Sequence, residues 1–274
     1  MPQTSQLRQW IFLTIALLCP IAVKAHEFWI EPLDYTVDVG DKLQAHLKNG
    51  QNFKGNTFAY IPNMFKFFDM VDSKGRRAVP GRLGDMPAVG FTAENDGLLV
   101  LGFRSVTNLL TYTEWEKFAN FVKAHKLDWV IDKHRERGLP ETNFVEAYFR
   151  FSKSLVKIGQ GQGHDVNTGM PFELVALTNP YTAAAPTEMR LRLFWQNKPY
   201  PGSEVHVFRR PSDGGDTIKT TYTTDANGEV AVPTSGGGEF LVNSVLMIEP
   251  TAEFSAINRA VWVSLWASIT YKIE

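Results

Sequence analysis

Turn-forming residues divide roughly the last hundred residues of the chain into short segments rich in β-branched and aromatic side chains. The turns lie at Asn197-Lys198-Pro199, Asp213-Gly214-Gly215, Asp225-Ala226-Asn227-Gly228 and Gly236-Gly237-Gly238. Glycine, proline, asparagine and aspartate set or tolerate the backbone angles that turns need. Short strands at this spacing predict an immunoglobulin-like or transthyretin-like β-sandwich over residues 165–274. The expected strands are Phe172–Leu177, Glu188–Gln196, Ser203–Arg209, Thr217–Thr223, Glu229–Val232, Phe240–Met247 and Ala260–Tyr271.

A second β-rich region lies near the start of the chain. Tyr35–Val39 and Lys42–Leu47 alternate apolar and polar side chains on either side of a turn at Gly40, and such alternation is typical of half-buried strands. Leu98–Arg104 has the composition of a buried strand. We therefore expect a β-sandwich region over residues 26–111.

In the segment between the two β-rich regions, residues 112–160, the apolar residues recur with a different period. Thr113 and Glu116 form a capping box, and apolar residues then recur at helical spacing. Gly138-Leu139-Pro140 interrupts the pattern, and Phe144–Val156 resumes it. The sequence therefore predicts two helices joined by a Gly-Pro turn. The expected fold is mainly β, with two sandwich regions and a two-helix insertion.

The first 25 residues have the three-part layout of a secretory signal peptide. A polar start with a single Arg8 precedes the apolar run Ile11–Val23, and small residues at Val23 and Ala25 suit a cleavage site. The run of about 13 residues is shorter than the roughly 20 that a membrane-spanning helix needs. We expect cleavage after Ala25, a mature chain that begins at His26, and a periplasmic protein without a transmembrane segment.

Removal of the signal peptide changes the charge and the cysteine content. Arg8 and Lys24 leave with it, so Lys+Arg falls from 28 to 26 while Asp+Glu stays at 29, which gives a net charge of 26 − 29 = −3. This charge argues against nucleic acid as a partner. The chain's one cysteine, Cys19, leaves as well. The mature fold must then depend on its hydrophobic core and not on disulfides.

The signatures of common enzymes are missing from the sequence. It contains no HExxH, HxxxH, CxxC or GxSxG pattern, and its glycine-rich stretches lack the Lys-Ser/Thr of a phosphate-binding loop. We therefore expect no catalytic residue and no enzymatic activity.

His26 is the leading candidate for a metal ligand. A chain that starts with histidine offers its α-amine, with a pKa of roughly 8, and the imidazole Nδ1 as a chelate. Cu(II), Ni(II) and Co(II) prefer such nitrogen donors. One further histidine would complete a set of three nitrogens, and we expect it to be His46, in a neighbouring strand, or His164, in a glycine-rich loop. Surface or packing positions are expected for the remaining histidines, His125, His134 and His206.

Several short motifs occur in an order that resembles a known family over nearly the whole mature chain. It is the periplasmic domain-of-unknown-function family often labelled a nickel-uptake family or the periplasmic component of a cobalt/nickel ABC-type transport system. The resemblance implies an exported β-rich protein that handles a transition metal, with a membrane transport system as its partner, and it identifies no catalytic residue. The motifs are Ala25-His26-Glu27-Phe28-Trp29-Ile30-Glu31-Pro32, Tyr148-Phe149-Arg150-Phe151-Ser152-Lys153-Ser154-Leu155, Pro171-Phe172-Glu173-Leu174-Val175, Lys198-Pro199-Tyr200-Pro201-Gly202, Thr224-Asp225-Ala226-Asn227-Gly228 and Trp262-Val263-Ser264-Leu265-Trp266.

These observations predict a non-enzymatic periplasmic protein that binds a transition-metal ion and supports its uptake or buffering. Nickel or cobalt follows from the resemblance, and copper follows from the chemistry of an amino-terminal histidine. The alternative is a non-catalytic envelope module that binds a protein or glycan partner. A metal-dependent oxidase built on the same nitrogens is a third interpretation. A metal carrier depends on His26, whereas an interaction module does not.

Overall fold

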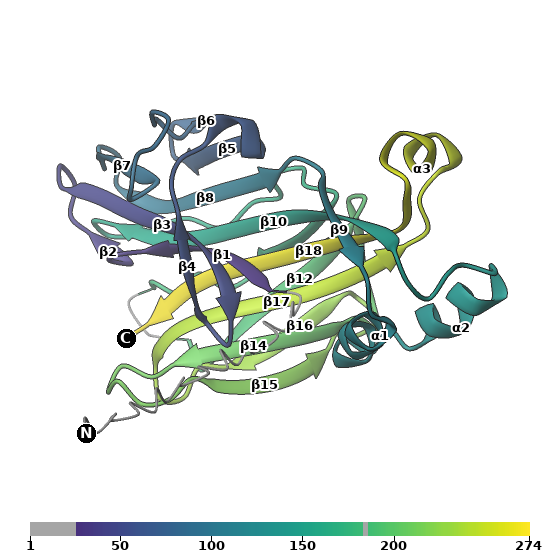
Figure 1. The fold of residues 1–274 in the computed structure, drawn as a ribbon. Helices are drawn as coiled ribbons and strands as arrows, with labels where there is room; N and C mark the ends of the chain where they lie inside the picture. The colour runs from purple at the N-terminus through teal and green to yellow at the C-terminus, as the bar shows by residue number, and fades with distance from the viewer. Residues whose placement is uncertain (1–25, 183–185) are drawn as a thin grey trace, which may run out of the picture.

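The computed structural model describes residues 26–182 and 186–274 (Figure 1). The chain is mainly β, with 51% of the described residues in strands and 11% in helices, which confirms the predicted fold class. The expected signal peptide and its cleavage after Ala25 lie outside the described residues. Within residues 26–182 and 186–274, no helix has both the length and the apolar composition that crossing a membrane requires.

One large sheet of ten strands runs through the molecule (Figure 1). Its last strand in the sequence lies at the centre of the sheet, antiparallel to one neighbour and parallel to the other. Segments from both predicted sandwich regions therefore share a single sheet. In spatial order the strands are β15 (Ile218–Thr223), β14 (Glu204–Arg210), β17 (Gly238–Ile248), β18 (Ala260–Ile273), β10 (Phe144–Ile158), β8 (Gly97–Ser105), β5 (Phe65–Asp72) and β6 (Gly75–Ala78), with β2 (Thr36–Val37) and β9 (Asn108–Tyr112) also paired to β10.

Two smaller sheets cover the opposite faces of the large sheet. Along β10, Phe151 and Leu155 point into one hydrophobic core, and Val156 and Ile158 point into another, as the alternation of side chains along a strand requires. The first core lies under the sheet of β11 (Phe172–Ala176), β12 (Glu188–Trp195), β13 (Lys198–Pro199) and β16 (Glu229–Pro233). The second lies under the sheet of β1 (Glu27–Pro32), β3 (Lys42–Gln51), β4 (Lys54–Phe58) and β7 (Val89–Thr92).

The strands expected from the sequence are largely present. Each of those predicted between residues 171 and 274 coincides with an observed strand, with ends that differ by at most two residues. Near the start of the chain, the predicted segments correspond to β2, β3 and β8. The proposed domain boundaries at residues 111, 160 and 165 stay a prediction.

The helices differ from the prediction in one important respect. Two helices, α1 (Trp115–Ala124) and α2 (Trp129–Glu136), lie within the expected insertion, and α1 ends where Lys126 adopts a positive φ of 50°. The second helix predicted, at Phe144–Val156, is wrong, because this segment forms β10. A strand that is covered on both faces carries apolar side chains on both, so it loses the alternation that would identify it.

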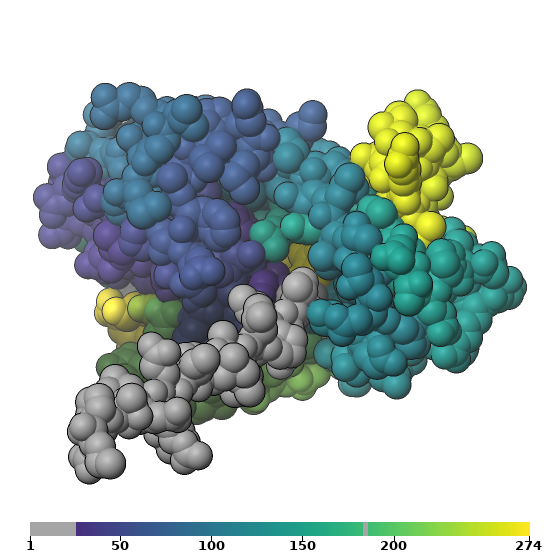
Figure 2. All heavy atoms as spheres, viewed as in Figure 1, coloured from purple at the N-terminus to yellow at the C-terminus, as the bar shows by residue number. Residues whose placement is uncertain are grey.

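The connection between β17 and β18 contains a third helix that the sequence did not predict, α3 (Ala252–Asn258). The Thr251 side chain caps its start by accepting a hydrogen bond from the backbone N–H of Phe254. In the space-filling view, α3 stands out from one end of the molecule (Figure 2). A short 3-10 helix, Pro62–Met64, precedes β5.

Candidate functional site

The described chain enters the fold through β1, which lies at the edge of its sheet. Side chains of β18 hydrogen-bond to the edge of this strand that has no neighbouring strand. The Ser268 hydroxyl donates to the carbonyl oxygen of Phe28 at 2.7 Å, and the Thr270 hydroxyl donates to that of Ile30 at 2.7 Å. Buried backbone carbonyls need such partners. These hydroxyls therefore supply hydrogen bonds that a neighbouring strand would otherwise provide.

These contacts also place the start of β1 along β18. Both strands run in the same direction at the contact, since Ser268 meets Phe28 and Thr270 meets Ile30. Two residues earlier on each strand, the half-buried His26 therefore lies at about the same height along β18 as Trp266. The Trp266 ring stacks on Phe121 with 5.4 Å between ring centroids, and it meets His125 edge-on at 5.3 Å. Phe121 belongs to α1, and His125 follows its last residue. The end of α1 therefore covers this part of the large sheet.

Beneath α1, His125 and His206 form a stacked histidine pair. Their ring centroids are 4.6 Å apart with an interplanar angle of 25°, and both residues are buried. Nε2 of His206 lies 2.7 Å from Oε1 of Glu204, and Oε2 of Glu204 pairs with Nζ of Lys126 at 3.0 Å. Glu204 thus links the histidine pair to the side-chain ammonium group of Lys126.

The pKa values of both histidines are lowered, which favours their neutral forms. Burial lowers the pKa of His125 well below its ordinary value, and the nearby His206 and Lys219 add to this effect. Burial likewise lowers the pKa of His206, although Glu204 opposes the change. The backbone of Ala124 faces the His206 ring and also raises this pKa, yet Nδ1 of His206 is buried and makes no hydrogen bond of ordinary geometry to any described residue.

This arrangement suits metal ligation by His206. When the ring proton is on Nε2, it is donated to the Glu204 carboxylate, and Nδ1 keeps its lone pair. Ligating histidines commonly donate their second ring N–H to a carboxylate in this way, which fixes the tautomer and orients the ring. In this tautomer, Nδ1 of His206 could accept a metal ion while Glu204 orients the ring.

Glu27, the first residue of β1, links the start of the described chain to the histidine pair. Burial raises the pKa of its carboxyl group to about 7, and the charge of Lys219 opposes the rise. Lys219 also lowers the pKa of both His125 and His206. The charge of Lys219 therefore acts both on the start of β1 and on the histidine pair.

The structure does not bring the three predicted ligands together. His46 lies opposite Glu31 in the register of β1 with β3, and Glu27 lies opposite Gly50. His46 is thus displaced from His26 by about five residues along the strand, or roughly 16 Å. His164 is exposed in the loop between β10 and β11. Among the described residues, no group of three or more histidine, cysteine, aspartate or glutamate side chains is arranged to hold a metal.

The sequence did not reveal the histidine pair. Val205 and Val207 flank His206, and this alternation predicted a polar, exposed face for the histidine. The structure shows that α1 covers that face. His125 was expected to have a surface or packing role, and it does pack against Trp266. No spacing in the sequence links residues that lie so far apart in the chain.

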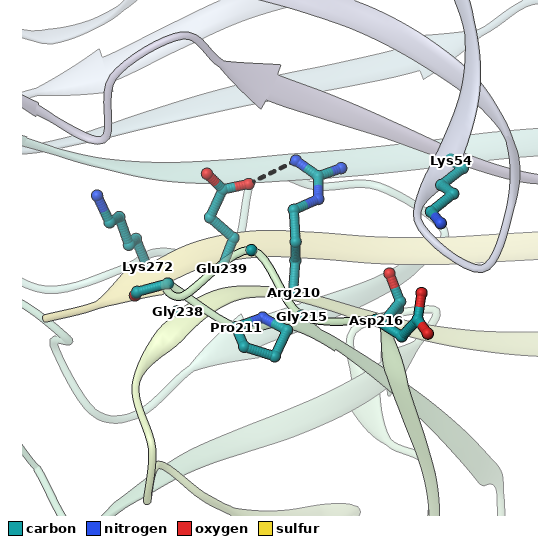
Figure 3. A pocket seen from close by; sticks show the side chains of 11 residues that line it. Lys54, Arg210, Pro211, Gly215, Asp216, Gly238, Glu239 and Lys272 are labelled. Carbon is teal, nitrogen blue, oxygen red and sulfur yellow. Dashed lines mark hydrogen bonds and ion pairs between the residues drawn. The ribbon is translucent and has the colours of Figure 1, made fainter.

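A polar cleft of about 380 Å³ opens at the opposite end of β14 and β18 from α1. Figure 3 shows Arg210 and Glu239 paired in this cleft, with Lys54 and Lys272 on either side. The Arg210 guanidinium lies 2.8 Å from Glu239 and 2.9 Å from Glu31. No histidine is among the described residues that line the cleft, so it is separate from the candidate metal ligands.

Comparisons with known proteins match a family without a known activity. The sequence model of the family described as "Domain of unknown function (DUF4198)" matches residues 23–247. No curated protein sequence matches the chain.

Solved structures give only distant likenesses. The D0-D1 domain of intimin is 10% identical, with 88% of this chain and 96% of that chain covered and a TM-score of 0.21. A tetra-tandem repeat from the extending region of a large adhesion protein is 12% identical, with 90% of this chain and 50% of that chain covered and a TM-score of 0.22. Escherichia coli alpha-2-macroglobulin is 10% identical, with 91% and 20% covered and a TM-score of 0.22. Likenesses at this level carry no argument about function.

Proposed function

Because the chain belongs to the DUF4198 family, whose description assigns no activity, we propose from its own residues that it binds a transition-metal ion outside the cytoplasm. Its role would be to carry that ion to a membrane uptake system or to buffer it. The site begins at His26, with the α-amine and imidazole of a cleaved chain as the first two nitrogen donors.

The observation that carries this proposal is the neutral histidine pair near the start of β1. His206 has a buried Nδ1 without a hydrogen bond to the described residues, and its Nε2 faces Glu204. A neutral imidazole with its proton held on one nitrogen is ready to ligate through the other. His206 is therefore our choice for the third nitrogen, with His125 beside it. His46 and His164 stay predicted ligands that variants must test.

An amino-terminal site needs fewer side chains than a conventional metal site. The α-amine supplies one donor, so two imidazoles complete a set of three nitrogens. A group of three ligating side chains, which is absent from the described residues, is not required. Nickel and cobalt are favoured by the family resemblance, and copper(II) binds nitrogen donors most strongly of the divalent ions in this series.

The first test compares two forms of the mature protein. One begins with His26, and the other carries one extra residue before it, which removes the chelate but keeps every side chain. Each is titrated with nickel, cobalt, copper and zinc ions, and bound metal is measured after dialysis. We expect only the native start to retain about one ion per chain. Equal retention by both forms would contradict the amino-terminal site.

Single variants then identify the internal ligand. We expect His206→Ala to weaken binding by at least about tenfold, because loss of even a residue that only supports a ligand commonly costs about that much. His46→Ala and His164→Ala are matched controls for histidines that the fold places away from β1. If either control loses the metal while His206→Ala retains it, the sequence-based ligand set is correct and our choice of His206 is wrong. Circular dichroism of each variant checks that it folds.

The polar cleft of Figure 3 favours a second candidate function, non-catalytic binding of an acidic envelope glycan. Its volume of about 380 Å³ falls in the usual range for small-molecule sites. Oligogalacturonate is a suitable probe because its carboxylates match Lys54 and Lys272. We expect the double variant Lys54→Ala/Lys272→Ala to lose affinity for the probe, with Lys123→Ala/Lys126→Ala, at the opposite end of the sheet, as the charge-matched control. Equal affinity in both variants would rule out this role for the cleft.

A further inference from the structure

Three ionisable side chains meet in the core between the large sheet and the sheet of β11, β12 and β16. Lys153 comes from β10, Asp165 from the loop that follows, and Glu173 from β11. None of the three side chains is exposed to solvent. We call this group the lysine cluster. Its neighbours on β10, Phe151 and Leu155, belong to the hydrophobic core.

Such a cluster contributes little net free energy to the stability of a fold. Desolvation of buried ions offsets much of their mutual attraction, and well-packed apolar side chains are often as stable in their place. Two carboxylates beside one ammonium also leave an unbalanced negative charge if all three groups are ionised. One proton held by a carboxyl group removes that imbalance. The lysine cluster is therefore suited to hold a lysine nitrogen beside a carboxylic acid, away from water.

The two groups that would react are already in contact. Nζ of Lys153 lies 2.6 Å from Oδ1 and 2.8 Å from Oδ2 of Asp165. The carbon between these oxygens is the electrophile in amide formation. Reacting atoms held within roughly 3–3.5 Å gain much of the advantage that enzymes obtain from orientation. The fold thus presents a nucleophile and an electrophile in a fixed, dry arrangement.

Backbone N–H groups are placed to stabilise charge on Asp165. The N–H of Val166 donates to Oδ1 at 2.8 Å, and the N–H of Ala176 donates to Oδ2 at 2.8 Å. Attack on the carboxyl carbon develops negative charge on an oxygen, and oriented backbone donors lower the energy of that state.

Glu173 is placed to move the proton. Its Oε1 lies 3.2 Å from Nζ of Lys153. Three hydrogen bonds fix the carboxylate, from the backbone N–H and the hydroxyl of Thr168 to Oε1 and from the backbone N–H of Met170 to Oε2. These donors hold the carboxylate in position to accept a proton from Lys153.

We propose that Lys153 and Asp165 condense within the folded chain to form an intramolecular amide bond, with Glu173 as the proton carrier. The Lys153 ammonium gives one proton to the Glu173 carboxylate, and the free amine attacks Cγ of the Asp165 acid. The C–N bond forms, the C–O bond to the hydroxyl group breaks, and a second nitrogen proton passes to that hydroxyl. One water leaves, Glu173 keeps the first proton, and no oxidant or other reactant is needed.

The test is the mass of the purified full-length protein after export. The cross-linked chain is lighter by one water than its sequence, but a succinimide elsewhere has the same effect on mass, so the position must also be shown. Trypsin cleaves after lysine and arginine. A Lys153–Asp165 amide therefore yields peptide 151–157, uncut at residue 153, attached to peptide 158–190. We expect this joined pair. Separate peptides with cleavage at Lys153 would show an ordinary buried ion pair and overturn the proposal.

Two variants test the chemistry. Asp165→Asn reaches the same product by releasing ammonia instead of water, so its joined peptides should match those of the natural sequence in mass. Glu173→Gln keeps the size of the side chain but cannot accept the proton, and we expect cross-linking after refolding to slow by about a hundredfold. An unchanged rate in Glu173→Gln would exclude Glu173 as the proton carrier. If a variant fails to fold, the peptide map of the natural protein alone decides whether the bond exists.

Discussion

Glu146 lies on β10 with its carboxyl group buried next to Ser264 and Tyr112. Burial raises its pKa from 4.5 to about 7, and hydrogen bonds from these two neighbours oppose the rise. Between these pH values, the folded protein binds a proton that the unfolded chain has released. The contribution of Glu146 to stability is therefore fully present below about pH 4.5 and is lost as the pH rises through about 7.

Glu146→Gln removes this titration. We expect the free energy of unfolding of the natural protein to fall relative to that of the variant by about 3 kcal/mol between pH 4.5 and 8. Urea unfolding of both proteins across this range measures the difference. Glu188→Gln, at an exposed position, is the matched control. A difference that stays constant with pH would show that the fold does not shift the titration of Glu146.

At the residue scale, the candidate site could be predicted only in part. His26 stands out because it follows an expected cleavage site, which is a local property of the sequence. The role of His206 depends on α1 packing over β14 and on Glu204 facing its ring. These are contacts between distant segments, and they leave no spacing in the sequence. The lysine cluster was likewise invisible, because Lys153 falls in a segment that was expected to be helical.

Among the elements, β10 shows why helix and strand were confused. Its residues from Phe144 to Ile158 are buried for most of their length, because sheets cover both of its faces. Apolar and small side chains then occupy most positions on both faces, and several of them also fit a helical period. By contrast, β12 and β16 alternate buried and exposed residues, and both were predicted correctly. Periodicity identifies half-buried strands better than central ones.

β1 depends on the hydroxyl groups of β18 in place of a neighbouring strand. Thr270→Val keeps the shape of the side chain but leaves the buried carbonyl of Ile30 without its donor. We expect the free energy of unfolding to fall by about 1–3 kcal/mol. Urea unfolding measures this loss, and amide hydrogen exchange should show faster exchange in β1 than in β12. Thr221→Val, on the exposed surface of β15, is the control. Equal stability of the two variants would contradict this account of the edge.

For the molecule as a whole, turn chemistry predicted where strands lie but not which strands pair. The turns between β11 and β18 are local, and residues such as Gly228 and Asn197 adopt the positive φ that they require. The parallel pairing of β10 with β18 joins residues as distant as Glu146 and Trp262. A hydrophobic pattern sets which face of a strand is buried, but it does not name its neighbour.

The shared sheet leads to a prediction about the proposed boundary at residue 165. A fragment of residues 165–274 contains β18 but lacks β10, so it exposes a long strand edge and the apolar faces beside it. Such edges promote aggregation. We expect this fragment to be insoluble or unfolded, whereas the chain from residue 26 to 274 folds. Size-exclusion chromatography and circular dichroism compare the two. A soluble fragment with cooperative unfolding would establish the carboxy-terminal region as an independent domain.

The central position of β18 also bears on the order in which the protein folds. A chain that is made from its amino end has β10 and β17 in place before the strand that belongs between them has been completed. Until then the two halves of the sheet have open edges, and the final step must join residues such as Ser154 and Thr270 that are far apart in the sequence. Contacts of such long range slow folding. The interval before β18 arrives is therefore the period in which a chaperone would be of most use to this protein.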